Sequence, residues 1–112
     1  MSGCSADTTE PYALRVTGDS MEPEFSDGHI IIVDPGLSVF EDAYIIVDYG
    51  GEVMLGQYTQ SQELPVIRYL NPDYQAVTLT PPYEIKGVVT QRVGKRRKDR
   101  KYYEHPDITG HW

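Results

Sequence analysis

The chain has 112 residues, of which 39% are apolar and 24% charged, and its formal net charge is −7. This length corresponds to one domain, and the composition is that of an ordinary globular protein. The first ten residues are small and polar and Cys4 is the only cysteine, so no signal peptide, membrane span or internal disulfide is expected. These features favour a cytoplasmic protein.

The charges are unevenly distributed along the chain. Residues 1–94 carry four basic and fourteen acidic side chains (net −10), whereas residues 95–112 carry six basic and three acidic ones (net +3). An acidic body with a basic tail argues against a domain that clamps nucleic acid over its folded surface. Only the tail has the charge for that role.

Seven short segments carry the apolar or alternating pattern of β-strands. They are residues 12–16, 29–34, 44–49, 52–58, 65–70, 76–80 and 85–93. Gly50-Gly51 separates the third from the fourth and favours a hairpin turn, because glycine accepts the positive φ that such a turn requires. No segment carries a helical apolar period longer than one or two turns. The sequence therefore predicts a mostly β fold, formed by a compact, curved, partly closed sheet.

The apolar pattern stops after Val93. We therefore expect a flexible N-terminal arm over residues 1–10, a folded domain over residues 11–94, and a basic and aromatic C-terminal tail over residues 95–112. The tail is expected to extend from the domain, although its aromatic side chains are suited to docking on a neighbour.

One serine occupies a position typical of a nucleophile. Ser20 lies in the run Gly18-Asp19-Ser20-Met21, which predicts a tight turn just ahead of the apolar segment 29–34. A serine displayed in this way attacks a carbonyl only if a nearby base accepts its proton. The identity of that base decides what the serine can do.

The serine run belongs to a longer pattern. Gly18-Asp19-Ser20-Met21-x-Pro23, followed by Asp27-Gly28 and an Ile/Val strand that ends at Asp34, resembles the LexA-like family of serine–lysine peptidases. DYGGEV (48–53), LNPDY (70–74) and KGVV (86–89) match later positions of the family in the same order. The family includes the C-terminal domains of LexA and phage repressors and the UmuD mutagenesis protein, and it is more distantly similar to signal peptidases. The resemblance covers about residues 11–94 and implies the fold of these domains.

The resemblance implies a serine–lysine dyad, in which the Ser20 hydroxyl gives its proton to a neutral lysine amine. It also implies that the backbone N–H groups of Ser20 and Met21 hold the oxyanion. In the family the lysine ends a run of the form D-G-E-x-x-V-K, and the matching run here, residues 50–56, places Gly56 at the lysine position. Glycine accepts no proton, so Ser20 is either a vestigial nucleophile or one that uses a non-standard base.

Two other side chains are candidates for the missing base. Lys86 opens the last long strand, where the family has no base, and it is expected to face solvent. His29 begins the strand that follows the serine turn and is expected at the surface. The chain also contains no Ala-Gly or Cys-Gly pair, the bonds at which members of the family cut themselves. Both deficits favour a chain without peptidase activity.

The tail offers a separate candidate site. Its six cations are Lys95, Arg96, Arg97, Lys98, Arg100 and Lys101, and two tyrosines follow them. Such a run can bind phosphates and stack on bases, or it can lie solvated or against the acidic body of the same or a neighbouring chain. His105, Asp107 and His111 are weak candidates for metal ligands, because two histidines in a tail without cysteines do not make a typical site. We predict no metal and no cofactor.

These residues lead to one main hypothesis and two alternatives. The main hypothesis is a catalytically inactive domain of the LexA or phage-repressor C-terminal type, which acts by self-association or partner binding in transcriptional or stress-response (SOS) regulation. The resemblance implies a homodimer formed by the C-terminal strands, here about residues 85–93. The alternatives are an active serine (auto)peptidase that uses Ser20 with a non-standard base, and a nucleic-acid-associated regulator that acts through the basic tail. No membrane partner is expected.

Overall fold

A computed structural model describes residues 10–61 and 63–106. This part of the chain is nearly all β, which confirms the predicted fold class. The elements are β1 (Tyr12–Arg15), β2 (Ile30–Asp34), β3 (Tyr44–Tyr49), β4 (Glu52–Ser61), β5 (Leu64–Arg68), β6 (Val77–Thr78), β7 (Glu84–Val93), η2 (Arg97–Asp99) and β8 (Lys101–Tyr102). Each of the seven segments with a strand pattern contains a strand, whereas β8 and the short 3₁₀ helix η2 had no such signal.

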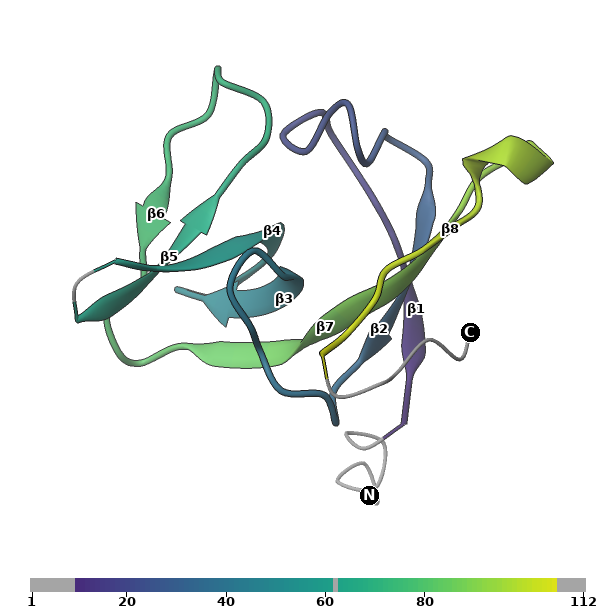
Figure 1. Ribbon diagram of the computed structural model, residues 1–112. Helices are drawn as coiled ribbons and strands as arrows, with labels where there is room; N and C mark the ends of the chain where they lie inside the picture. Colours follow the sequence, from purple (N-terminus) through teal and green to yellow (C-terminus); the bar gives the residue numbers. More distant parts are fainter. Residues whose placement is uncertain (1–9, 62, 107–112) are drawn as a thin grey trace.

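The strands form one antiparallel sheet in the order β1-β2-β7-β3-β4-β5-β6. Figure 1 shows that this sheet is strongly curved, with β1 and β2 on one side and β4, β5 and β6 on the other. β1 and β6 stand at the two ends of the order and do not pair with each other, so the sheet is not closed into a barrel. Gly50 and Gly51 have φ values of 63° and 86°, and they join β3 to β4 in the hairpin that the sequence predicts.

β7 connects the two halves of the sheet. One edge pairs with β2 over Val88–Val93, and the other pairs first with β3, over Glu84–Val88, and then with β8 at Gln91 and Arg92. The register shifts within both long pairings, between Ile32 and Val33 and between Ile46 and Val47. Such irregularities bend a strand and increase its twist, which lets β7 follow the curve of the sheet.

The apolar side chains form two clusters. The first contains Met21, Phe25, Ile31 and Ile46, and Leu55 and Tyr69 pack against it. The second contains Ile45, Val47, Ile67, Leu79 and Val88. Alternation along β3 sends Ile45 and Val47 to the second cluster and Ile46 to the first, so both faces of this strand are buried.

The segment after Val93 folds back on the domain. β8 pairs with the end of β7. The Tyr103 ring lies beside the rings of Phe25 and Tyr44, and the distance between ring centroids is 5.6 Å in both pairs. His105 is 3% exposed, packs edge-on against Phe40 and shares a hydrogen bond of 2.6 Å with the Ser38 carbonyl. The expected extension of the tail from the domain therefore does not describe residues 101–105, which lie against the body of the same chain.

No helix in residues 10–61 and 63–106 is long and apolar enough to cross a membrane.

Candidate functional site around Ser20

The loop between β1 and β2 carries Ser20 and also supplies part of the core. Met21 and Phe25 are 1% and 0% exposed, and the Phe25 N–H donates a hydrogen bond to the Met21 carbonyl at 2.9 Å. Gly18 has a φ of 85° and donates its N–H to the Asp27 carboxylate at 2.7 Å. Burial of the two apolar side chains fixes the loop, because a packed core leaves few alternative positions for them.

The run LNPDY (70–74) forms hydrogen bonds with the serine turn. The Asn71 N–H donates to the Ser20 carbonyl at 3.0 Å, and the Asn71 amide donates to the Asp19 carbonyl at 3.0 Å. The Tyr74 hydroxyl donates to the Asp19 carboxylate at 2.6 Å. These contacts join residues more than fifty positions apart and fix the backbone on both sides of the Ser20 side chain.

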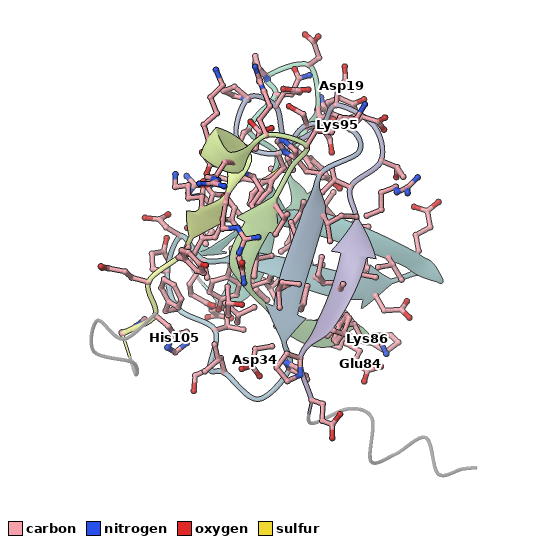
Figure 2. The ribbon with its side chains drawn as sticks, turned by 90° about the vertical axis from the view of Figure 1, so that its right-hand side faces the viewer. Asp19, Asp34, Glu84, Lys86, Lys95 and His105 are labelled. Atoms are coloured by element: carbon pink, nitrogen blue, oxygen red, sulfur yellow. The ribbon has the colours of Figure 1, made fainter. Side chains whose placement is uncertain are left out.

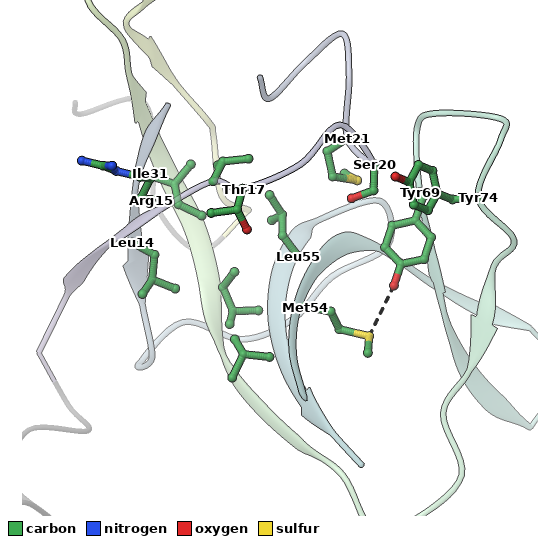
Figure 3. A pocket seen from close by; sticks show the side chains of 13 residues that line it. Leu14, Arg15, Thr17, Ser20, Met21, Ile31, Met54, Leu55, Tyr69 and Tyr74 are labelled. Atoms are coloured by element: carbon green, nitrogen blue, oxygen red, sulfur yellow. Dashed lines mark hydrogen bonds between the residues drawn. The ribbon is translucent and has the colours of Figure 1, made fainter. Parts of the chain in front are cut away.

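Ser20 lines a cavity of about 270 Å³ between β1, β3 and β4. Figure 3 shows the Ser20 hydroxyl directed into this space, with Leu55 on its floor and Tyr69 and Tyr74 on one side. The walls are mainly apolar, and the lining residues are Leu14, Arg15, Val16, Thr17, Ser20, Met21, Ile31, Ile46, Val53, Met54, Leu55, Tyr69 and Tyr74.

The Ser20 hydroxyl has no base beside it. Within the described residues, its oxygen makes no hydrogen bond, and neither a lysine nor a histidine lines the cavity. Arg15 is the one cation in the wall, and a guanidinium remains protonated. Burial raises the pKa of Tyr69, and the hydrogen bond to Asp19 raises the pKa of Tyr74, so neither phenol is ready to accept a proton at neutral pH.

The backbone groups predicted to hold an oxyanion are free to donate. In the described part of the chain, neither the Ser20 N–H nor the Met21 N–H donates a hydrogen bond. Two free N–H groups in one turn are the kind of donors that stabilise an oxyanion. Among the described residues, the turn thus presents one hydroxyl and two unbonded N–H groups, and neither a lysine nor a histidine lines the cavity beside them.

Gly56 lies in β4 opposite Ile45 and does not line the Ser20 cavity. A Cβ atom at this position would lie 2.1 Å from Ile67 Cγ2 and 3.2 Å from the Arg68 carbonyl oxygen. Ile67 is fully buried in the second apolar cluster. The structure therefore does not bring Gly56 and Ser20 together, and the space that any side chain at position 56 would enter is already filled.

The two alternative bases lie elsewhere. Lys86 lines a different cavity and its ammonium is 3.4 Å from the Glu84 carboxylate; Figure 2 shows this pair at the opposite end of the molecule from Asp19. His29 follows the serine loop, and its Nδ1 accepts the Ser26 N–H at 2.9 Å. Neither side chain lines the Ser20 cavity.

A second cavity, of about 540 Å³, adjoins the first. Both are lined by Leu14, Ile46 and Val53, and the second continues past Tyr12 and Ile85 to Lys86. We call the surface formed by these six residues the trough. Val53 is 61% exposed within it, and β1 beside it pairs only with β2, so the trough is an open apolar surface next to a sheet edge.

The six tail cations are all exposed and lie at or near the turn between β7 and β8. They do not line the Ser20 cavity. Of the weak metal-ligand candidates, His105 is buried against Ser38 and Phe40, whereas Asp107 and His111 lie outside the described residues. Within the described ranges, no three His, Cys, Asp or Glu side chains are placed to hold a metal ion.

One interaction of the tail had no signal in the sequence. The Glu24 carboxylate, on the serine loop, accepts hydrogen bonds from Lys101 at 2.8 Å and Tyr103 at 2.6 Å. Arg92 donates to the Glu24 carbonyl at 2.6 Å and lies 3.4 Å from its carboxylate. Partial burial opposes ionisation of Glu24, but the hydrogen bonds and the two positive charges outweigh it and lower its pKa. The Glu24 carboxylate thus joins the serine loop to the tail, in addition to the contact between the Phe25 and Tyr103 rings.

Comparison with known proteins places the chain in a family. A family model described as Peptidase S24-like matches residues 2–90. The chain is also similar to the HTH-type transcriptional regulators for conjugative element SXT of Vibrio cholerae and for conjugative element pMERPH of Shewanella putrefaciens. Each is 33% identical over an alignment of 89 residues, which covers 73% of this chain and 41% of the relative. The chain therefore spans about two fifths of their length. The match over most of its residues confirms the predicted resemblance: this chain belongs to the Peptidase S24-like family.

Proposed function

We propose that this chain is a LexA-like domain without peptidase activity that acts by protein association in the regulation of transcription. The observation that carries the proposal is the Ser20 cavity, in which a displayed hydroxyl has no lysine, histidine or carboxylate beside it among the described residues. In serine peptidases, loss of one member of the catalytic unit costs up to about 10⁶ in rate. Free oxyanion donors alone do not replace that loss.

The filled space around Gly56 supports the same proposal. The Cβ atom of a lysine at this position would overlap Ile67 and lie 3.2 Å from the Arg68 carbonyl oxygen. Restoring a base therefore requires repacking of the second apolar cluster in addition to one substitution. An active peptidase would need Ser20 to transfer its proton to a group outside the cavity wall, and no contact favours that alternative.

The trough supports association. It is apolar, open and continuous with the serine cavity, and exposed apolar patches of this kind mark interaction sites on soluble domains. Ile85 and Lys86 of the trough belong to the segment 85–93, for which the resemblance implies a homodimer. Both edges of β7 are paired within the chain, so we propose that a second copy contacts the trough through side chains rather than by adding a strand to β7.

The regulatory role rests on similarity. The relatives named above are transcriptional regulators for conjugative elements, and we propose that this chain acts in the same kind of process, in the cytoplasm, by binding itself or a regulator of that type. The trough, which needs no catalysis to function, is the surface we assign to this association.

Sedimentation equilibrium and intact-mass analysis test both parts of the proposal. We expect a dimer that dissociates on dilution, and a mass that stays unchanged after long incubation at neutral and alkaline pH. Val53→Glu, in the trough, should shift the equilibrium to monomer, whereas Leu64→Glu, at a partly exposed apolar position on β5 away from the trough, should not. A monomer at every concentration would contradict self-association, and Ser20-dependent shortening of the chain would contradict inactivity.

A further inference from the structure

The turn between β7 and β8 is a folded basic hairpin. Gln91 pairs with Tyr102 and Arg92 with Lys101, and η2 closes the turn between the strands. The Asp99 carboxylate accepts the Arg96 N–H at 3.1 Å, and the Arg92 guanidinium donates to the Asp99 carbonyl at 2.8 Å. Figure 1 shows η2 at the tip of this hairpin, away from the centre of the sheet. We call residues 94–101 the basic hairpin.

Most of its positive charge is not neutralised. Lys101 is paired with Glu24, and Arg96 lies 3.7 Å from Asp99 with its side chain 68% exposed. Arg100 donates to the neutral side chains of Gln91 and Tyr102. Lys95, Arg97 and Lys98 pair with no carboxylate of the described residues. The single acid, Asp99, is turned inward, with 19% of its side chain exposed, so the cations determine the outer surface.

The cations gather around a hollow. A concave surface of about 450 Å³ is lined by Lys95, Arg96, Arg97 and Arg100, together with Val93 and Gly94. Four cationic side chains around one hollow fit a multiply charged anion, because guanidinium groups donate paired hydrogen bonds to phosphate oxygens and ammonium groups add point charges.

We propose that the basic hairpin binds the phosphate backbone of a nucleic acid, without reading its sequence. A nucleic acid presents closely spaced phosphates, which several neighbouring cations can contact at once. A membrane is a poorer fit, since stable binding there needs several apolar side chains that enter the bilayer. Residues 94–101, GKRRKDRK, contain none, and the adjoining Tyr102 ring is 45% exposed. The proposal concerns a surface separate from the Ser20 cavity and the trough, and it stands without the proposed function.

The cations of the basic hairpin make this binding sensitive to salt, because they displace counterions from the phosphates. The protein has a net charge of −7, so only local attraction at the basic hairpin favours the nucleic acid. Charges are largely screened beyond about 10 Å at 0.1 M ionic strength, which limits repulsion from distant carboxylates. Electrostatic binding of this kind has dissociation constants on the order of 10⁻⁶–10⁻⁴ M. We expect measurable binding at low salt that weakens steeply as salt is added.

The test is fluorescence anisotropy of the full chain with a labelled DNA duplex of arbitrary sequence and with its single strand, over a series of salt concentrations. Arg97→Gln should weaken binding to both and reduce the slope of log K against log salt by about 1, and Arg97→Gln/Lys98→Gln should reduce it by about 2. Arg68→Gln removes the same charge from β5, at an exposed position paired with Asp42, and should leave both affinity and slope nearly unchanged.

Three results would overturn the proposal. They are the absence of binding to duplex and single strand at low salt, an equal loss in Arg97→Gln and Arg68→Gln, and binding to vesicles that contain phosphatidylserine but not to DNA. The variants are expected to fold like wild type, because the side chains of Arg97 and Lys98 are exposed and make no hydrogen bond or ion pair in the described residues. Circular dichroism of each variant checks this directly.

Discussion

The serine loop and the Gly56 segment of β4 correspond to the two halves of a dyad, yet the fold uses them differently. The loop gives Met21 and Phe25 to the first apolar cluster and is held by Asn71 and Tyr74. Gly56 adds no side chain to the second cluster, and Ile67 occupies the space beside it. The serine turn therefore contributes side chains to the core, whereas position 56 contributes none. Under the proposed function, the turn keeps its place in the fold without a catalytic role.

The largest expected effect on stability is at Phe25 of the serine loop, and it contrasts with a small effect at Ser20. Phe25→Ala should lower the free energy of unfolding by about 3–5 kcal/mol, because it empties a fully buried position. Ser20→Ala should change it by less than about 0.5 kcal/mol, since the hydroxyl has no partner among the described residues. Chemical denaturation followed by circular dichroism measures both. A strong destabilisation by Ser20→Ala would show that the hydroxyl has a structural role we have not found.

The second prediction concerns the close fit at Gly56. Gly56→Ala should cost about 1–3 kcal/mol, because the added methyl group overlaps Ile67 Cγ2. Ile67→Ala removes that atom at its own cost, so the double variant should lose less stability than the sum of the two single variants. Strict additivity in this double-mutant cycle would mean that the two positions do not compete for one space.

The third prediction concerns Glu24, which joins the serine loop to the tail. Glu24→Gln should lower the free energy of unfolding by about 1–2 kcal/mol, because it weakens charge-assisted hydrogen bonds from Lys101 and Tyr103. The pKa of Glu24 is lowered in the folded chain. Its contribution is therefore present above the unfolded pKa of about 4.3 and is lost as the pH falls through the folded value.

The pH dependence of unfolding checks this linkage. Wild type should lose stability relative to Glu24→Gln as the pH is lowered from about 5. Asp73→Asn is the control, because the Asp73 carboxylate is exposed and makes no hydrogen bond in the described residues. This variant should lose stability at low pH to the same extent as wild type. Parallel curves for wild type and Glu24→Gln would contradict a role for the Glu24 charge.

The smallest expected effect is at the hydrogen bond between Tyr74 and Asp19 of the serine turn. Tyr74→Phe removes the hydrogen bond to Asp19 and should lower the free energy of unfolding only slightly, since the contact is exposed. Hydrogen exchange should show faster opening of residues 18–21 with little change in β3 or β7. If exchange rises equally across the sheet, Tyr74 supports the whole fold and not the turn alone.

Most of the sheet could be predicted because its strands alternate or are continuously apolar. β8 could not, since it has only two residues and they follow a run of charges. The burial of Tyr103 depends on Phe25, Tyr44 and Glu24, which are distant in sequence.

For the site, the sequence predicts Ser20 as the candidate nucleophile and Gly56 at the lysine position, and both assignments remain predictions. It could not show that Gly56 faces Ile67, because the direction of a strand residue depends on register and curvature as well as on spacing.

The most direct measurement of the central claim is labelling of the purified chain with a fluorophosphonate, followed by peptide mass spectrometry, at neutral and alkaline pH. With no base beside its hydroxyl, Ser20 should remain unmodified, and wild type and Ser20→Ala should give the same result. Rapid, stoichiometric modification of Ser20 that disappears in Ser20→Ala would show that a proton acceptor is present and would contradict the account.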